Sequence, residues 1–182
     1  MRKAPARGAW ALLLLGLALA FWAPALSAAS LLVRNPARPV PPDFILPEVR
    51  SEQPFHLAGM KGRVVIVNFW WTGCPSCLAE MPALDKLWRM LKDKGVIVLG
   101  VHMGGRPDVV RRYVQRLGVS FPVLWDSARA VSRQWGVAYT PTTMILGRDG
   151  RLDYVAFGGR VWTNPEILSA IVALTRAPCP TC

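Results

Sequence analysis

Two nearly continuous hydrophobic runs mark the middle of the chain, at residues 63–71 (RVVIVNFWW) and 96–103 (VIVLGVHM). A strand with one solvated face alternates polar and apolar residues, whereas continuous runs are typical of strands that are buried on both faces. We therefore expect two central strands of a sheet that helices cover on both sides.

Segments with helical spacing follow these runs. Apolar residues recur every three or four positions in 75–94, 106–119 and 164–176. Gly95 suits the C-terminus of the first helix, and Asn164 suits the N-cap of the last. Strands that alternate with helices predict an α/β fold with a central mixed sheet flanked by helices. Shorter patterns predict a hairpin over 43–60, a strand and a short helix over 121–137, and a second hairpin over 142–159.

The N-terminal residues differ from the rest in composition. Basic residues among the first positions precede an uncharged apolar run over 8–33, as in an export signal. The run is also long enough to span a bilayer, which needs about 20 residues, and small residues allow cleavage after Ser27 or Ala29. Residues 1–33 are therefore expected to be a signal peptide or a membrane anchor, and the rest of the chain to be periplasmic or otherwise extracytoplasmic.

The remaining chain divides by composition. Residues 34–42 contain four prolines and are expected to form an extended linker. Residues 43–177 have the pattern of a globular domain, and residues 178–182 form a tail with two cysteines. Lys and Arg exceed Asp and Glu by 22 to 11. No nucleic-acid motif accompanies them, so we expect no nucleic-acid partner; anionic lipid, an acidic partner or a soluble basic surface would all suit this charge.

The strongest chemical signal is the pair Cys74 and Cys77. Cys74 follows a predicted strand and leads a predicted helix, with Pro75 in the first helical position, which tolerates its missing N–H. The partial positive charge of a helix N-terminus favours a thiolate, so Cys74 is the expected nucleophile and Cys77 the resolving thiol. Such a redox-active disulfide needs no further cofactor. A stapling disulfide and a zinc site, which would need two more ligands, are the alternatives.

The stretch 64–84 (VVIVNFWWTGCPSCLAEMPAL) resembles the TlpA-like (ResA-like) extracytoplasmic branch of the thioredoxin superfamily, and the resemblance covers residues 43–176. Pro82 stands where thioredoxin-like proteins have the proline that kinks the active-site helix, and Pro141 stands where they have a cis-proline. Glu80 matches an acid that this branch carries three residues after the second cysteine. The resemblance implies a thioredoxin fold with an N-terminal hairpin and a central strand–helix insertion.

The resemblance also implies roles for single residues. Pro141 would face Cys74 across a substrate groove. Glu80, if it is buried beside the dithiol, would have a raised pKa and could move the proton that Cys77 must lose. An ordinary turn proline and a solvated carboxylate are the alternatives at these two positions. The implied substrate-binding residues are Trp71, Pro75, Thr140 and Pro141.

The sequence departs from the family pattern at two positions. Gly73 stands where the family often has tryptophan, and Asn68 stands where cytoplasmic thioredoxins have a buried aspartate, so the proton role falls to Glu80 or to water. Ser76 stands where strong oxidants of the DsbA type have histidine, which favours a more reducing dithiol. The resemblance then implies protein thiol/disulfide substrates, such as apocytochrome c or the cysteines of copper sites, and a membrane electron donor of the CcdA/DsbD type.

A copper-binding module of the Sco type is the main alternative function. That type spaces its cysteines as Cys-x-x-x-Cys and adds a distant histidine, for which His102, with Met103 beside it, is the candidate. Peroxidase chemistry is a third hypothesis, because Thr72 precedes Cys74 by two residues. The resolving Cys77 and the lack of an upstream proline argue against it.

A second Cys-x-x-Cys, formed by Cys179 and Cys182, ends the chain after the last predicted helix. No helix follows it to lower a thiol pKa, and chain ends are often mobile. We expect an unstructured or locally bridged tail. A flexible dithiol that shuttles electrons to or from Cys74–Cys77, and a metal-capture site, are the alternatives.

Overall fold

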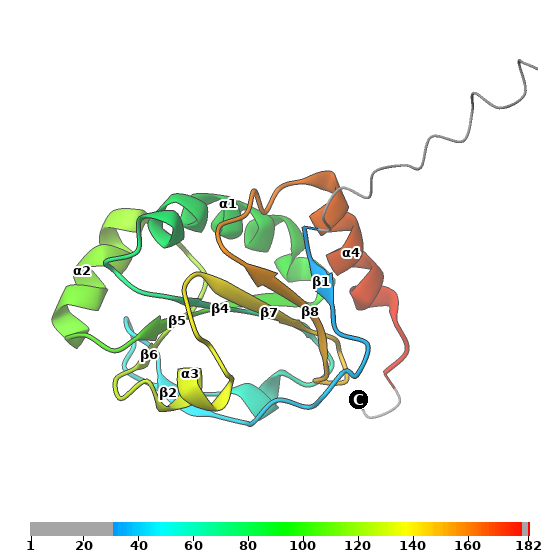
Figure 1. Cartoon of the computed structure of the whole chain (residues 1–182), viewed down its shortest axis with the longest axis horizontal. Helices are drawn as coiled ribbons and strands as arrows, with labels where there is room; N and C mark the ends of the chain where they lie inside the picture. Colours follow the sequence, from blue (N-terminus) through cyan, green and yellow to red (C-terminus); the bar gives the residue numbers. More distant parts are fainter. Residues whose placement is uncertain (1–30, 180–181) are drawn as a thin grey trace, which may run out of the picture. The chain divides into compact units, whose positions relative to one another are not determined.

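A six-stranded mixed sheet forms the centre of the computed structural model, which describes residues 31–179 and 182 (Figure 1). Its strands are β1 (Val33–Arg34), β4 (Val64–Trp70), β5 (Val96–Met103), β6 (Val123–Asp126), β7 (Thr142–Leu146) and β8 (Leu152–Phe157). They lie in the order β1-β8-β7-β4-β5-β6. β4, β5 and β6 are parallel to one another, whereas β7 is antiparallel to both of its neighbours, and β1 is antiparallel to β8.

Helices lie on both faces of this sheet, which confirms the predicted α/β architecture. The helices are α1 (Pro75–Leu91), α2 (Pro107–Leu117), α3 (Ala130–Gln134) and α4 (Pro165–Arg176), with 3₁₀ turns η1 (Leu57–Met60) and η2 (Lys92–Lys94). α1, α2 and α4 pack on one face. α3 packs on the other face with the separate hairpin β2 (Ile45–Pro47) and β3 (Pro54–His56), as Figure 1 shows. The predicted hairpins and the central strand–helix insertion are therefore present.

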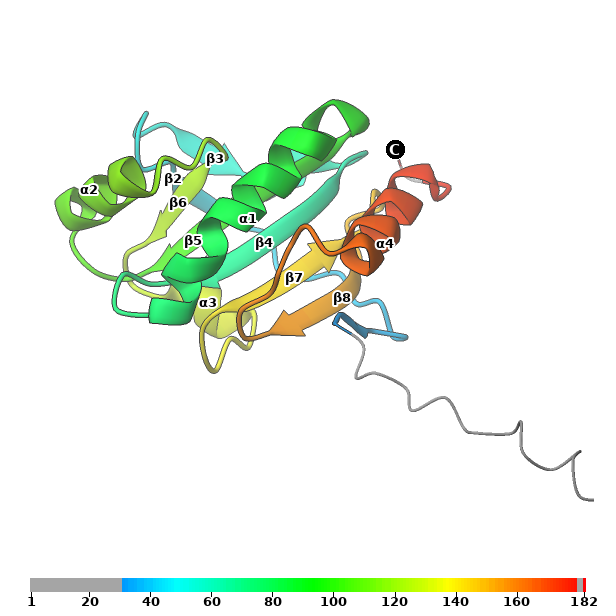
Figure 2. The same cartoon turned by 90° about the horizontal axis from the view of Figure 1, so that it is seen from above.

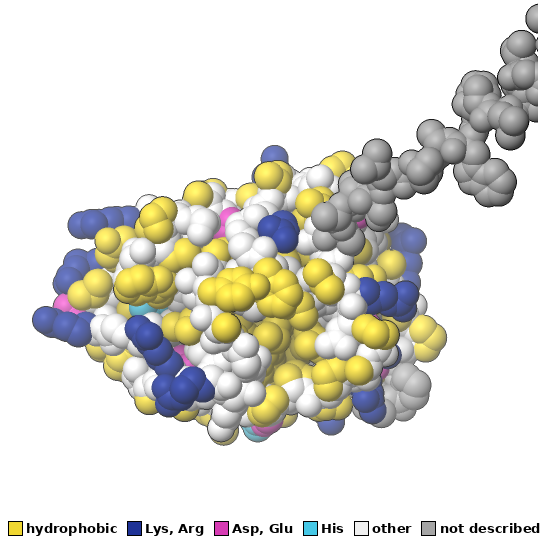
Figure 3. All heavy atoms as spheres, in the orientation of Figure 1, with side chains coloured by type: hydrophobic (Ala, Val, Ile, Leu, Met, Phe, Trp, Pro, Cys, Tyr) yellow, Lys and Arg dark blue, Asp and Glu magenta, His cyan; other side chains and the backbone are white. Residues whose placement is uncertain are grey.

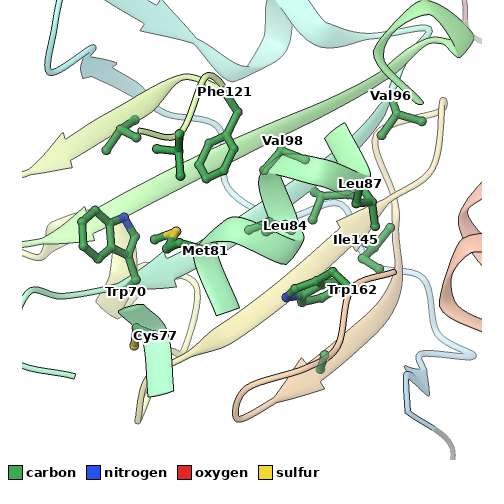
Figure 4. Packing of buried hydrophobic residues seen from close by; sticks show 14 of the residues in the cluster. Trp70, Cys77, Met81, Leu84, Leu87, Val96, Val98, Phe121, Ile145 and Trp162 are labelled. Carbon is green, nitrogen blue, oxygen red and sulfur yellow. The ribbon is translucent and has the colours of Figure 1, made fainter. Parts of the chain in front are cut away.

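The hydrophobic run of β4 is continuous because both faces of the strand are covered. Ile66 packs under α1 and α4, whereas the next residue, Val67, packs toward α3 and the small hairpin. Figure 4 shows Met81, Leu84 and Leu87 of α1 lying over the sheet, and all three are fully buried. Alternate residues of β4 therefore pack into two separate hydrophobic cores. This packing fixes the positions of β4 and of α1.

The helix ends follow local rules. The side chain of Asn164 accepts a hydrogen bond from Glu166 N (2.8 Å), which confirms it as the N-cap of α4. Gly95 has the predicted left-handed conformation (φ 80°), but η2 separates it from the end of α1 at Leu91. The predicted position of the helix end is therefore correct, although the turn before Gly95 is a 3₁₀ turn, which is tighter than an α-helical turn.

The segment 34–42 is packed on the domain, which corrects the expectation of a free linker. β1 adds to the edge strand β8, and Arg38 Nε donates a hydrogen bond to Asp153 Oδ1 (2.6 Å). Further along, Trp135 Nε1 donates to Pro42 O (3.0 Å). The prolines keep this segment extended, but the free backbone groups of an edge strand and one buried carboxylate bind it to the domain surface.

The compact unit begins at Leu31 rather than at Asp43. Leu32 is buried and packs in the core under α1 and α4. The predicted signal peptide or anchor otherwise lies outside the described residues. Among the residues that the structure describes, no helix combines the length and the apolar character needed to cross a membrane.

Candidate active site

The disulfide Cys74–Cys77 lies at the junction of β4 and α1, as the sequence predicts. Cys74 is the N-cap of α1 and Pro75 occupies its first turn. The exposed fraction is 6% for Cys74 and 0% for Cys77, so an incoming sulfur can reach only Cys74. The geometry therefore distinguishes an outer sulfur from an inner one.

The groups around Cys74 would stabilise a thiolate only moderately. The N–H of Cys77 lies 3.2 Å from Cys74 Sγ, and the hydroxyl of Ser76 lies 3.4 Å from it. A free N–H at a helix N-terminus favours negative charge on the sulfur. Both of these neighbours are neutral, and no cationic side chain in the described part of the chain makes a hydrogen bond to this sulfur.

Glu80 is buried one helical turn after Cys77, with an exposed fraction of 4%. Its carboxylate accepts hydrogen bonds from Asn68 Nδ2 (2.8 Å), Arg160 N (2.9 Å) and Trp162 Nε1 (2.9 Å). Burial raises the pKa of Glu80, and the three hydrogen bonds oppose this shift without cancelling it. The carboxyl group is therefore not the solvated helix acid that was the alternative, and it can hold a proton more easily than an exposed glutamate.

The loop between β8 and α4 supplies two of these contacts, and the sequence did not predict it as part of the site. A Cβ atom on Gly159 would lie 3.5 Å from Ser76 O and 3.9 Å from Glu80 Oε2, so the loop backbone lies against the first turn of α1. Trp162 is fully buried within the core drawn in Figure 4. A large aromatic residue in a short loop was the available sequence signal.

Asn68 joins Glu80 to the sheet. Its side-chain Nδ2 donates to Glu80 Oε1 and to Thr143 Oγ1, both at 2.8 Å. Asn68 is fully buried, and its Oδ1 has no hydrogen-bond partner among the described residues. The position where the resemblance would place the aspartate of cytoplasmic thioredoxins thus holds a neutral side chain here, and the carboxyl group bonded to it is that of Glu80.

Two of the remaining predicted residues, Trp71 and Thr140, line a surface hollow, whereas Pro141 is buried. The bond between Thr140 and Pro141 is cis, as expected from the resemblance. The hollow is lined by Trp71, Met103, Arg129, Ala138, Tyr139 and Thr140. Trp71 and Tyr139 are about half exposed, at 43% and 55%. On the face shown in Figure 3, hydrophobic side chains gather at the centre and many Lys and Arg side chains lie toward the margin.

His102 is occupied by structural hydrogen bonds. Its Nε2 accepts from Thr72 N (3.1 Å) and its Nδ1 donates to Gly104 O (2.9 Å). The ring stands edge-on to Trp70, with centroids 4.7 Å apart. Burial lowers the pKa of His102 to about 4. Nε2 thus holds the loop before Cys74 and Nδ1 holds the segment after β5, which gives the copper hypothesis no free imidazole nitrogen at this position.

Comparison with known proteins places this site in a family. Residues 38–155 match the AhpC/TSA family. The chain belongs to the AhpC/TSA family. It is 34% identical over 117 residues to the thiol-disulfide oxidoreductase ResA of Halalkalibacterium halodurans, a match that covers 64% of this chain and 66% of that protein. The ResA protein of Bacillus subtilis is 31% identical over 117 residues, with 64% and 65% covered. The matches thus span about two thirds of these relatives.

Solved structures share the fold of this chain. A thioredoxin-family thiol:disulfide interchange protein from Chlorobium tepidum is 25% identical, with a TM-score of 0.66 over 76% of this chain and 99% of that one. A secreted thiol-disulfide isomerase from Corynebacterium glutamicum, 22% identical, shares the fold with a TM-score of 0.72 over 83% of this chain and 95% of that one. The predicted resemblance to thiol–disulfide oxidoreductases of the ResA type, and the thioredoxin fold, are confirmed.

Proposed function

We propose that this protein is a thiol–disulfide oxidoreductase that reduces disulfides of protein substrates outside the cytoplasm. The observation that carries the proposal is the bonded pair at the start of α1, with Cys74 as its outer sulfur. In the reduced protein, the Cys74 thiolate attacks one sulfur of a substrate disulfide and the other sulfur leaves. Cys77 then attacks Cys74, which re-forms the Cys74–Cys77 disulfide and releases the substrate as a dithiol.

Glu80 acts as the proton acceptor in the second step. Cys77 is fully buried and must lose its proton before it can attack Cys74. The buried carboxyl group of Glu80 lies one helical turn away, and its raised pKa makes it a better proton acceptor than an exposed glutamate. Asn68, Arg160 and Trp162 fix the orientation of this carboxyl group.

The direction of electron flow follows from how weakly the reduced state is stabilised. The groups that contact Cys74 Sγ are the neutral N–H of Cys77 and the hydroxyl of Ser76. The buried carboxyl group of Glu80 adds negative charge nearby whenever it is ionised. A dithiol whose thiolate gains little stabilisation gives up electrons readily, so the pair is a reductant rather than an oxidant.

The proposed substrate is a protein disulfide, and the proposed electron source is a protein dithiol. Thr140 and the exposed Trp71 line one surface hollow, which suits an extended protein segment bound near Cys74. The basic start and the apolar run that follows it support export, either as a cleaved signal or as an inner-membrane anchor. Electrons then come from a membrane thiol carrier of the CcdA/DsbD type. Apocytochrome c and the cysteines of copper sites are the substrates that the family resemblance favours.

The reduction potential of Cys74–Cys77 tests this direction. The full-length protein, with Cys179 and Cys182 replaced by serine, is equilibrated in dithiothreitol buffers and the alkylated thiols are counted by mass spectrometry. We expect a potential nearer to the about −270 mV of thioredoxin than to the about −120 mV of DsbA. Ser76→His is the matched control, because an added imidazolium should stabilise the thiolate and make the potential less negative. A wild-type value near that of DsbA would overturn the assignment as a reductant.

A further inference from the structure

The second cysteine pair lies at the opposite end of the domain from the first. Cys179 and Cys182 are joined by a disulfide, so the expected local bridge is present. Cys182 Sγ lies 3.3 Å from Arg148 O, in the turn between β7 and β8. The same carbonyl accepts a hydrogen bond from Gly62 N (2.9 Å), just before β4 begins. Because Cys74 follows the other end of β4, the whole strand separates the two pairs; Figure 2 shows the C-terminus at the end where α1 finishes.

The closed tail disulfide has a short reach toward the Cys74 of its own chain. β4 has seven residues, which corresponds to about 20 Å at the usual rise of a strand. Arg148 Nη1 donates a hydrogen bond to Ala177 O (3.3 Å), which holds the start of the tail at the far end. The Cα atoms of Cys179 and Cys182 are 5.4 Å apart while the bridge is closed, so from Ala177 the bridged tail extends only about 13 Å. Length therefore disfavours attack by Cys74 on the tail disulfide of the same molecule, whereas a second copy can approach the tail where it lies.

The tail pair has the properties of a disulfide that can exchange. Its cysteines are three positions apart, and so short a loop adds little to stability as a staple. Cys182 is exposed and Cys179 is half-buried, so an incoming thiolate meets Cys182 first. The guanidinium group of Arg148, bonded to Gly62 O (3.0 Å) and Ala177 O, lies beside the tail and would stabilise a departing thiolate.

We propose that Cys179–Cys182 is a second redox site, which is reduced by the Cys74–Cys77 dithiol of a second copy of this chain; the inference rests on the proposed function. The Cys74 thiolate of the donor copy attacks Cys182 Sγ, the Cys179–Cys182 bond breaks, and Cys179 leaves as a thiolate that takes up a proton. The donor's Cys77 then attacks its own Cys74, loses its proton and frees Cys182 as a thiol. The donor is oxidised by two electrons and the tail is reduced by two.

Two full-length variants separate the pairs. Cys74→Ser/Cys77→Ser keeps only the tail disulfide, and Cys179→Ser/Cys182→Ser keeps only the first pair. The second variant is reduced, freed of reductant and mixed with the oxidised first variant, and alkylated thiols are counted by mass spectrometry over time. Doubling the concentration of the reduced variant should double the initial rate of tail reduction. Wild-type protein loaded with one electron pair should redistribute it between its two sites at a rate that also rises with concentration.

The possible outcomes distinguish a failure of the second redox site from a failure of the proposed function. A redistribution rate in the wild type that does not change with concentration would overturn the intermolecular route. A tail that stays oxidised, while the same donor reduces the small disulfide 5,5′-dithiobis(2-nitrobenzoate), would overturn the second redox site and leave the proposed function standing. A donor that fails to reduce the small disulfide as well would overturn the proposed function, and the inference with it.

Discussion

The hydrogen bonds of Glu80 allow its structural and chemical roles to be separated by two substitutions. Its carboxylate accepts hydrogen bonds from Asn68, Arg160 and Trp162. In Glu80→Ala these three donors lose their acceptor, and a buried donor without a partner costs about 1–3 kcal/mol. Removal of the buried carboxyl group also removes its desolvation cost, which offsets part of this loss of stability. We therefore expect Glu80→Ala to lower the free energy of unfolding by about 3 kcal/mol or more.

Glu80→Gln should leave the fold nearly intact. Its amide oxygen still serves Arg160 N and Trp162 Nε1. The Asn68 side chain can rotate to offer its Oδ1, which lacks a partner among the described residues, to the new amide N–H groups. The expected loss of stability is then below about 1.5 kcal/mol. Because an amide cannot accept the proton of Cys77, the rate of substrate reduction should fall roughly 100-fold.

Two assays on the same preparations decide between these roles. Urea unfolding gives the free energy of unfolding of each variant. Stopped-flow reduction of a protein disulfide, followed across acidic and alkaline pH, gives the rate of the thiol chemistry. If Glu80→Gln reacts at the wild-type rate with the wild-type pH profile, Glu80 supports the fold alone and the assignment of the proton acceptor is wrong.

Substitutions at three further positions test other parts of the structure. The pKa of His102 is lowered from 6.5 to about 4. The unfolded chain therefore binds a proton at this imidazole more tightly than the folded protein does. Stability should fall by about 3 kcal/mol as the pH drops from 6.5 to 4, and His102→Gln should flatten that part of a pH series of urea unfolding curves. Asn164→Ala should cost about 1 kcal/mol in the same assay, whereas Asn164→Ser should retain the cap. Arg38→Ala leaves the Asp153 carboxylate, 8% exposed, without this partner; thermal unfolding should show a loss of about 1–3 kcal/mol with an unchanged reduction rate.

The central strands and α1 could be predicted because their burial requires a pattern of apolar residues within each segment's own sequence. Both faces of β4 are covered, so all of its residues are buried and all except Asn68 are apolar. The dithiol could be predicted for a similar reason. Cys74, Pro75 and Cys77 form a contiguous motif whose chemistry depends on the helix N-terminus that the same residues create.

The other contacts depend on partners far away in the sequence. Nothing local to Glu80 indicates that Arg160 and Trp162 will close over it, because the fold of β7 and β8 brings that loop back to α1. The proline-rich segment 34–42 has the composition of a spacer, and only the edge of β8 makes it part of the domain. The position of Cys182 beside Arg148 likewise follows from the length and direction of α4, which the cysteine spacing does not encode.

Trapping of the mixed disulfide tests most directly whether Cys74 is the nucleophile. Full-length Cys77→Ser, with Cys179 and Cys182 also replaced by serine, cannot release a bound substrate, so it should accumulate disulfide-linked partners. Non-reducing electrophoresis and mass spectrometry should locate every such bond at Cys74. The matched variant, with Cys74→Ser in place of Cys77→Ser, should trap none. Failure of Cys77→Ser to trap any partner, or adducts on Cys77 in the Cys74→Ser variant, would contradict the assignment of Cys74 as the nucleophile and Cys77 as the resolving thiol.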